Sequence, residues 1–329
     1  MRFIIYGAGA IGGVLGARLY QRRTDVVLIA RGEHRIAIQS SGLVLESPSE
    51  TVTLPLTVVA HPSEITFEPE DVVVLAIKSQ DTTQALAALR EFAGDAIPIV
   101  CCQNGVANER EASRLFEHVY GMAVLMPAAH LEPGVVQTTT TGATGVLDCG
   151  LYPLGIDDTI REIAFTLEEA TFVSRVDPAI MRMKYAKLLR NLGNALQAAC
   201  GSPDGANELM RRVRAEALDC YAAAGIDCAG RDEFRARVAG RLDQAPIQGR
   251  PRSGGSSWQS LSRGTGSIEA DHLNGEITLL GRLHGVPTPA NRALQQIANE
   301  LARAGAQPAS LSIDAVRKRV ERLAASSHP

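Results

Sequence analysis

A run of glycines near the N-terminus constrains the fold of this chain more than any other feature. Gly7-Ala8-Gly9-Ala10-Ile11-Gly12 follows the apolar run 3–6 and precedes a segment with apolar residues at helical spacing. In a strand–turn–helix unit this G-x-G-x-x-G pattern permits a tight turn, a close approach of pyrophosphate to the backbone, and close packing of helix on strand. The helix N-terminus adds oriented N–H groups and positive potential. We therefore predict that these six residues bind a dinucleotide.

The rest of the first half alternates between apolar runs and helical patterns. Residues 26–30, 72–77 and 97–102 read as buried strands, and residues 82–92 read as a helix. Uniformly apolar strands separated by helices are typical of a parallel sheet covered on both faces. Residues 120–147 change to β-branched residues with Gly and Pro, which indicates antiparallel strands appended to that sheet.

The second half reads as helical, with segments expected at 179–200, 204–224, 231–243, 267–284 and 290–304. A Gly/Ser-rich stretch at 249–257 interrupts the pattern and, taken alone, indicates a surface loop. For 329 residues we therefore expect an α/β protein with an N-terminal Rossmann dinucleotide-binding domain (1–176), a C-terminal all-helical domain (177–310), and a C-terminal tail (311–329).

Composition excludes several classes of function. The chain has 33 basic and 36 acidic residues without charge blocks, which argues against nucleic-acid and membrane partners. The longest early apolar run, 72–77, is far below the ~18 residues of a membrane span, and a strand at 2–6 leaves no room for a signal peptide. Six cysteines without a C-x-x-C pair indicate a reducing, cytoplasmic location. A homodimer is expected from base rates alone.

The end of the second predicted strand favours NADPH over NADH. NAD-binding sites usually carry an acidic residue there, about 20 residues after the glycines, which binds the ribose hydroxyls. This chain has Arg31 and no carboxylate at the strand end, and a guanidinium matches a 2′-phosphate in a bidentate way. Glu33 is a competing detail, although its position in the first turn of the next helix suits a capping role.

Two other predicted strands end on polar residues. Lys78 follows the run 72–77, and Asn104 follows the run 97–102 within Gln103-Asn104-Gly105. Strand C-termini in open α/β sheets face the ligand crevice, so both residues are candidate cofactor or substrate contacts. The alternatives are a solvated lysine at a strand end and a turn that uses Asn-Gly for backbone reasons.

Two stretches of the helical half concentrate polar residues. Lys187, Asn191 and Asn194 fall at i, i+4 and i+7, and therefore on one face of a helix beside an apolar stripe. Glu269 falls on the helical line of Leu273, Ile277 and Leu280, so its carboxylate is expected to be buried and either paired with a cation or hydrogen-bonded. Residues 269–272 also spell E-x-x-H, but no second copy occurs, and no metal site is expected.

Taken together and in this order, these pieces resemble the ketopantoate reductase (2-dehydropantoate 2-reductase) family over roughly residues 1–305. The matching segments are the 7–12 turn, 28–32, 77–78, 103–105, Lys187 with Asn191, Ser256-Ser257, Glu269 with Asp271, Asn274-Gly275 and 285–289.

The resemblance implies an NADP-dependent oxidoreductase that reduces a 2-oxo acid to a 2-hydroxy acid, most closely ketopantoate to pantoate in pantothenate and coenzyme A biosynthesis. It gives Lys187 the role of general acid and Glu269 that of a substrate-binding and orienting carboxylate. Asn104, Asn191 and Ser257 become substrate contacts, and the 249–257 stretch becomes a candidate lid. The position eight residues after Lys187, usually a second asparagine in the family, is Ala195. Another oxo acid or an imine therefore stays open as the substrate, as does a non-catalytic NADPH-binding sensor.

Overall fold

A computed structural model describes residues 1–202, 204–247, 254–264 and 266–326. The chain forms two compact units. The first comprises residues 1–184 and 231–252, and the second comprises residues 185–230 and 253–329. The first unit thus extends past residue 176, the boundary expected from the sequence, and takes in a second stretch of chain.

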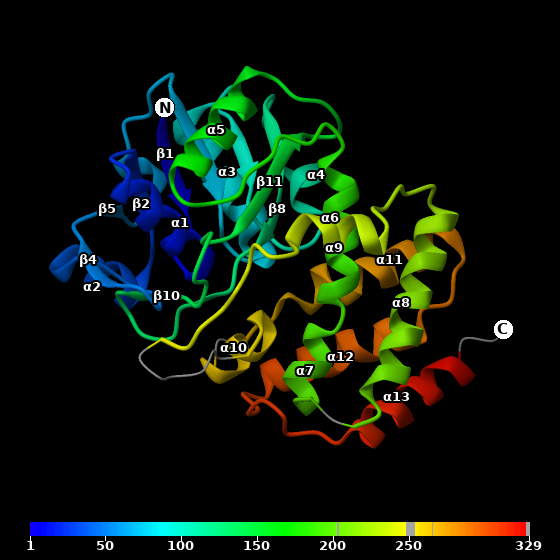
Figure 1. The fold of residues 1–329 in the computed structure, drawn as a ribbon. Coiled ribbons are helices and arrows are strands. Elements are labelled where there is room, and N and C mark those ends of the chain that lie inside the picture. The colour runs from blue at the N-terminus through cyan, green and yellow to red at the C-terminus, as the bar shows by residue number, and fades with distance from the viewer. Residues whose placement is uncertain (203, 248–253, 265, 327–329) are drawn as a thin grey trace. The chain divides into compact units, whose positions relative to one another are not determined.

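In the described residues of the first unit a seven-stranded sheet has the spatial order β11-β8-β7-β6-β1-β2-β5 (Figure 1). All neighbouring pairs are parallel except β11 with β8. The six parallel strands, numbered along the chain, lie in the order 3-2-1-4-5-6 of the Rossmann fold. The strands are β1 (Arg2–Tyr6), β2 (Asp25–Ile29), β5 (Thr57–Val59), β6 (Asp71–Leu75), β7 (Ile99–Cys101), β8 (Val119–Leu125) and β11 (Val146–Leu151).

Both faces of this sheet are buried, which explains its uniformly apolar strands. Phe3 and Ile5 of β1 point into one core with helices α1 (Ala10–Gln21) and α5 (Asp158–Glu169). Ile4 and Tyr6 point into the other core with α3 (Thr82–Ala93). Successive side chains of a strand alternate between faces, so an unpaired polar residue is disfavoured on either face. The predicted strands and the helix near 82–92 are confirmed.

A second sheet, absent from our sequence analysis, has the order β4-β3-β10-β9. Its strands are β3 (Leu43–Glu46), β4 (Thr51–Leu54), β9 (Ala128–Ala129) and β10 (Val135–Thr138). The expectation of antiparallel strands in 120–147 appended to the main sheet is therefore wrong in part, because β8 runs parallel to β7 and β10 belongs to the second sheet. The second sheet was not predicted because its strands are short and lack the continuous apolar runs of strands that are buried on both faces.

The segment 231–252 is tied to the first unit by a buried ion pair. Its helix α9 (Arg231–Val238) carries Arg237, whose guanidinium donates to the carboxylate of Asp148 on β11. Asp148 is 1% exposed and also accepts from the backbone N–H of Arg175 at 3.1 Å. Further along, the backbone N–H of Ala245 donates to the carbonyl of Thr139 at 2.9 Å. These contacts attach helix α9 and the residues near Ala245 to the first unit. The sequence of this stretch gives no sign that it belongs to the first unit rather than to the helical second unit.

Two predicted helices of the second half are interrupted. The helix predicted over 179–200 is α6 (Ile180–Asn191) followed by α7 (Asn194–Cys200), with a turn at 192–193. The helix predicted over 267–284 is the 3₁₀ turn η3 (Glu269–His272) followed by α11 (Asn274–His284). Leu273 between them has non-helical dihedral angles (φ −111°, ψ −87°), so Glu269 does not continue the apolar line of α11 as predicted.

The remaining helices of the second unit are α8 (Ala206–Ala223), α10 (Ser256–Ser262), α12 (Pro289–Arg303) and α13 (Ile313–Ala325). Glu216 of α8 caps α12, because its carboxylate accepts from the backbone N–H groups of Ala290 (2.9 Å) and Asn291 (3.0 Å). Helix α13 lies within the stretch expected as a tail and buries Val316 and Val320. Residues 248–253 of the candidate lid lie outside the described residues. None of the helices described is long and apolar enough to cross a membrane.

Candidate active site

A cavity of about 240 Å³ lies at the carboxyl ends of β1, β2 and β6 in the first unit. Successive strands are added outward from β1 toward β5 on one side and from β6 toward β8 on the other, so the strand order reverses between β1 and β6. Ligands of open α/β sheets bind at such a switch point. The cavity is lined by the glycine turn, by Ile77 two residues after β6, and by the start of helix α2 (Gly32–Ser41). The lining residues are Tyr6, Gly7, Ala8, Gly9, Ile29, Ala30, Arg31, His34, Ile77, Asp81, Ala85 and His130.

The glycine turn has the shape that a pyrophosphate needs. Gly7 has φ +105°, a conformation that side chains disfavour. A Cβ on Gly12 would lie 2.1 Å from the carbonyl oxygen of Gly7, so the helix could not pack there with any side chain. A Cβ on Gly9, by contrast, would meet nothing within 4 Å. The open side of Gly9, at the N-terminus of α1, is therefore where a dinucleotide fits.

His34 ties this turn to the rest of the cavity wall. Its Nδ1 accepts from the backbone N–H of Gly134 at 2.9 Å, so the proton sits on Nε2, which donates to the carbonyl of Ala8 at 2.7 Å. The ring lies 4.0 Å from that of His130 between centroids. Burial lowers the pKa of His34. The sequence motifs do not single out His34, whose only sequence signal is its place in the first turn of α2.

Arg31 precedes α2 and is exposed at the rim of the same cavity. Glu33 is also exposed, in the first turn of that helix. Ala10, Ile11 and Gly12 begin α1, and Lys78 follows β6 directly before the 3₁₀ turn η2 (Ser79–Asp81). The structure thus gathers the residues predicted for the cofactor within the first unit, and Arg31 brings a cation to a cavity rim.

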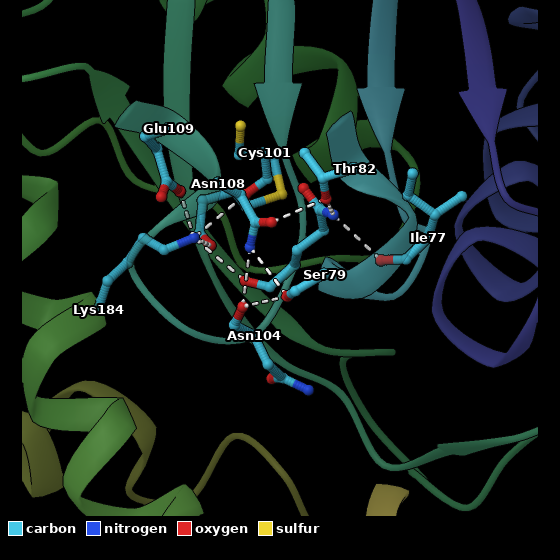
Figure 2. Close-up of polar contacts among 10 residues, drawn as sticks. Ile77, Ser79, Thr82, Cys101, Asn104, Asn108, Glu109 and Lys184 are labelled. Atoms are coloured by element: carbon cyan, nitrogen blue, oxygen red, sulfur yellow. Dashed lines mark hydrogen bonds and ion pairs between the residues drawn. The ribbon is translucent and has the colours of Figure 1, made fainter. Parts of the chain in front are cut away.

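A polar network holds the turn that carries Asn104 (Figure 2). The carbonyl of Asn104 accepts from Asn108 Nδ2 at 3.1 Å and from Ser79 Oγ at 3.4 Å. The side-chain amide of Gln103, a residue that is 3% exposed, donates to Thr82 Oγ1 at 2.8 Å. The Gln103 side chain is therefore part of the network. The side chain of Asn104 points away from the network in Figure 2. The turn therefore presents one amide outward on a rigid backbone.

The residues predicted for substrate and proton transfer lie in the second unit, apart from Asn104. Lys187 and Asn191 are half-buried on α6, Ser257 is buried on α10, and Glu269 is buried at the start of η3. The prediction that Glu269 is buried is confirmed.

Hydrogen bonds connect the elements that carry these side chains. Asn274 Nδ2 donates to the carbonyl of Leu192, directly after α6, at 3.1 Å. Asn194 Nδ2 donates to Ser256 Oγ at 3.4 Å, which joins α7 to α10. Ala195 is buried. The end of α6, η3–α11 and α10 are thus linked within one unit, while the turn at 192–193 takes Asn194 off the α6 face on which it was predicted.

Comparisons with known proteins agree with this geometry. Residues 3–148 match the family model described as ketopantoate reductase PanE/ApbA, and residues 179–302 match its C-terminal model. The chain belongs to the ketopantoate reductase family. The resemblance inferred from the motifs is confirmed, and so is the expected pairing of a Rossmann domain with a helical domain.

Individual relatives of this chain are also named 2-dehydropantoate 2-reductase or ketopantoate reductase. A 2-dehydropantoate 2-reductase of Halobacterium salinarum is 28% identical over 93% of this chain and 100% of its own length. One from Pyrococcus horikoshii is 33% identical, over 58% of this chain and 61% of that protein. A PanE/ApbA family ketopantoate reductase from Ralstonia eutropha JMP134 has a TM-score of 0.77 at 28% identity, over 93% of this chain and 99% of that one.

Proposed function

We propose that this chain reduces ketopantoate to pantoate with NADPH. The observation that carries the proposal is the crevice beside Gly9, which fits a dinucleotide in a chain that belongs to the ketopantoate reductase family. In the reaction NADPH and a proton are consumed, the C2 carbonyl becomes a secondary alcohol, and NADP⁺ is released.

Arg31 supports the choice of NADPH. It stands at the rim of the cavity, and no carboxylate ends β2, whose last residues are apolar. The N-terminal end of α1 would hold the pyrophosphate, and Arg31 would hold the 2′-phosphate through charge-assisted hydrogen bonds. When bound there, NADPH supplies the hydride for the carbonyl carbon.

The proposed general acid is Lys187. Negative charge develops on the carbonyl oxygen as the C–H bond forms, and an ammonium group can stabilise that charge and donate the proton that completes the alcohol. Glu269 would bind and orient the substrate, together with Asn104, Asn191 and Ser257. Glu269 is 7% exposed.

The test is NADPH oxidation with ketopantoate, with pantoate identified chromatographically, in the wild type and in Lys187→Ala. We expect the variant to lose kcat by about 10²–10⁴-fold while NADPH still binds, because the proton is transferred only in the chemical step. Lys187→Arg should not restore the rate, since a guanidinium does not give up its proton. Lys318→Ala, at an exposed lysine on α13, is the matched control. Normal turnover by folded Lys187→Ala would remove the assignment.

Reduction of another 2-oxo acid or an imine is the second candidate. It is favoured by Ala195, which is buried where the family usually carries a second asparagine, so one polar contact to the substrate is missing. A panel of 2-oxo acids and imines assayed beside ketopantoate separates the two. The highest kcat/KM on a substrate other than ketopantoate would replace the first proposal.

We also propose that the enzyme works as a homodimer in a reducing, cytoplasmic compartment. Six free cysteines, four of them buried, support the compartment. Light scattering of the purified protein tests the dimer.

A further inference from the structure

We propose that Lys184 and Glu109 form a positioning pair for the reaction, setting both the turn of Asn104 and the first half of helix α6. The inference rests on the proposed function, because it assigns Asn104 and Lys187 to the reaction. Neither member of the pair contacts the cofactor cavity, so they act through the residues that they hold.

The pair is almost fully enclosed in the first unit. The side chains of Lys184 and Glu109 are 2% and 0% exposed, and their charged groups form an ion pair (Figure 2). The Lys184 ammonium also donates to the backbone carbonyls of Gln103 (3.1 Å), Met122 (3.2 Å) and Cys101 (3.3 Å). An ammonium has three hydrogens, and these four acceptors use all of them.

Glu109 depends on this one cation. Among the described residues, no hydrogen-bond donor other than the Lys184 ammonium reaches its carboxylate. A buried ion pair is weak evidence for stability, because apolar residues of similar volume often stabilise a fold as well or better. A buried pair whose cation also holds three backbone carbonyls, at the end of β7, in the turn that follows it and within β8, points to a role in geometry.

The clamp acts on both sides of Asn104. Lys184 holds the carbonyl of Gln103, the preceding residue. Asn108, which precedes Glu109 in helix α4 (Asn108–Ala112), holds the carbonyl of Asn104 itself. The backbone that carries the Asn104 side chain in Figure 2 is thus held at Gln103 by Lys184 and at Asn104 by Asn108.

The same lysine fixes α6. Because Lys184 reaches carbonyls at the end of β7 and within β8, the part of α6 that belongs to the first unit is anchored to the main sheet at this residue. Lys187 lies three residues further on the same helix, about 4.5 Å along the axis. A shift or rotation of the anchored turn is transmitted to Lys187 through the hydrogen-bonded backbone.

The test removes both charges together, since a single substitution would strand a buried charge and risk unfolding. We expect the double variant Lys184→Met/Glu109→Met to fold and to bind NADPH as the wild type does. Its kcat/KM for ketopantoate should fall by about 10²-fold, through both kcat and KM, as misplacement of reacting groups by about 1 Å produces. If this variant does not fold, Lys184→Gln/Glu109→Gln takes its place, because an amide still donates to one carbonyl.

The matched control is Arg182→Met/Glu233→Met. It breaks a partly exposed ion pair of 2.9 Å between Arg182 of α6 and Glu233 of α9. The kinetic constants of this variant should stay at wild-type values. Wild-type kinetics in the folded Lys184/Glu109 double variant, or an equal loss in the control, would overturn the positioning role.

Hydrogen exchange of the free proteins separates this proposal from the proposed function. The amides of 102–108 and 180–187 should lose protection in the double variant, while those of β1 stay protected. If the wild type fails to reduce ketopantoate, the proposed function falls, and the exchange result still decides: unchanged protection at 102–108 overturns the clamp, and lost protection supports it.

Discussion

Acidification should destabilise the glycine turn through His34. In its neutral form this side chain accepts one hydrogen bond from the backbone of Gly134 and donates one to the carbonyl of Ala8. Protonation at Nδ1 replaces the acceptor with a second N–H, which then faces the N–H of Gly134. The bond to Ala8 survives, so the loss comes from two N–H groups, that of Gly134 and the new one on the ring, which face each other without an acceptor.

The size and sign of the effect follow from this count. An unsatisfied buried donor costs about 1–3 kcal/mol. Burial lowers the pKa of His34 below the 6.5 of an unperturbed histidine. As the pH falls below 6.5, the unfolded chain binds a proton that the folded chain does not, so the free energy of unfolding falls with it. The loss is complete once the pH is below the folded pKa, and above 6.5 His34 contributes no pH dependence.

Urea unfolding at a series of pH values measures this dependence. His34→Gln should flatten the acid limb of the stability profile, because the amide can accept and donate without titrating. His118→Gln, at an exposed histidine of the same unit, should keep the wild-type limb. NADPH affinity should fall in the same pH window, since Ala8 belongs to the turn. Identical acid limbs in the wild type and His34→Gln would refute the reasoning.

Three further outcomes are expected. Arg31→Ala should weaken NADPH by about 1.5–3 kcal/mol and leave NADH unchanged in fluorescence titrations; equal loss of both cofactors would contradict the 2′-phosphate assignment. Gly12→Ala should abolish dinucleotide binding, because its Cβ would lie 2.1 Å from the Gly7 carbonyl, and intact binding would show that the turn adapts. Glu216→Ala should cost about 3 kcal/mol in urea unfolding, since buried N–H groups at the start of α12 lose their acceptor; a change below about 1 kcal/mol would exclude this cap.

The features that the sequence predicted are those that local physics decides. Strands β1, β2 and β6 are continuous apolar runs because both faces of the sheet are covered. The spacing of Gly7, Gly9 and Gly12 encodes a turn that tolerates no side chain at two of its three glycines. Arg31 and Asn104 could be nominated because each directly follows a recognisable strand, and parallel strands present their carboxyl ends to one crevice.

The features that escaped prediction depend on partners distant in sequence. The turn at 192–193 interrupts a segment whose composition is helical throughout, and the carbonyl of Leu192 there is bonded to Asn274, 82 residues away. Lys184 reads as an ordinary helix lysine, yet its ammonium is enclosed by β7, β8 and Glu109. No periodicity distinguishes a lysine that solvent will surround from one that carbonyl groups will surround.

The return of residues 231–252 to the first unit gives the backbone three passages between the units, after residues 184, 230 and 252. A single cut therefore cannot release either unit as an intact fragment. Truncation at 184 would strand the Asp148 carboxylate inside β11 by discarding Arg237. A minimal cofactor-binding protein made from this chain has to join 184 to 231 with a linker, and a helical fragment has to join 230 to 253. The two units thus alternate along the chain, and recombination that exchanges a whole unit between family members would have to exchange two segments together, through three junctions.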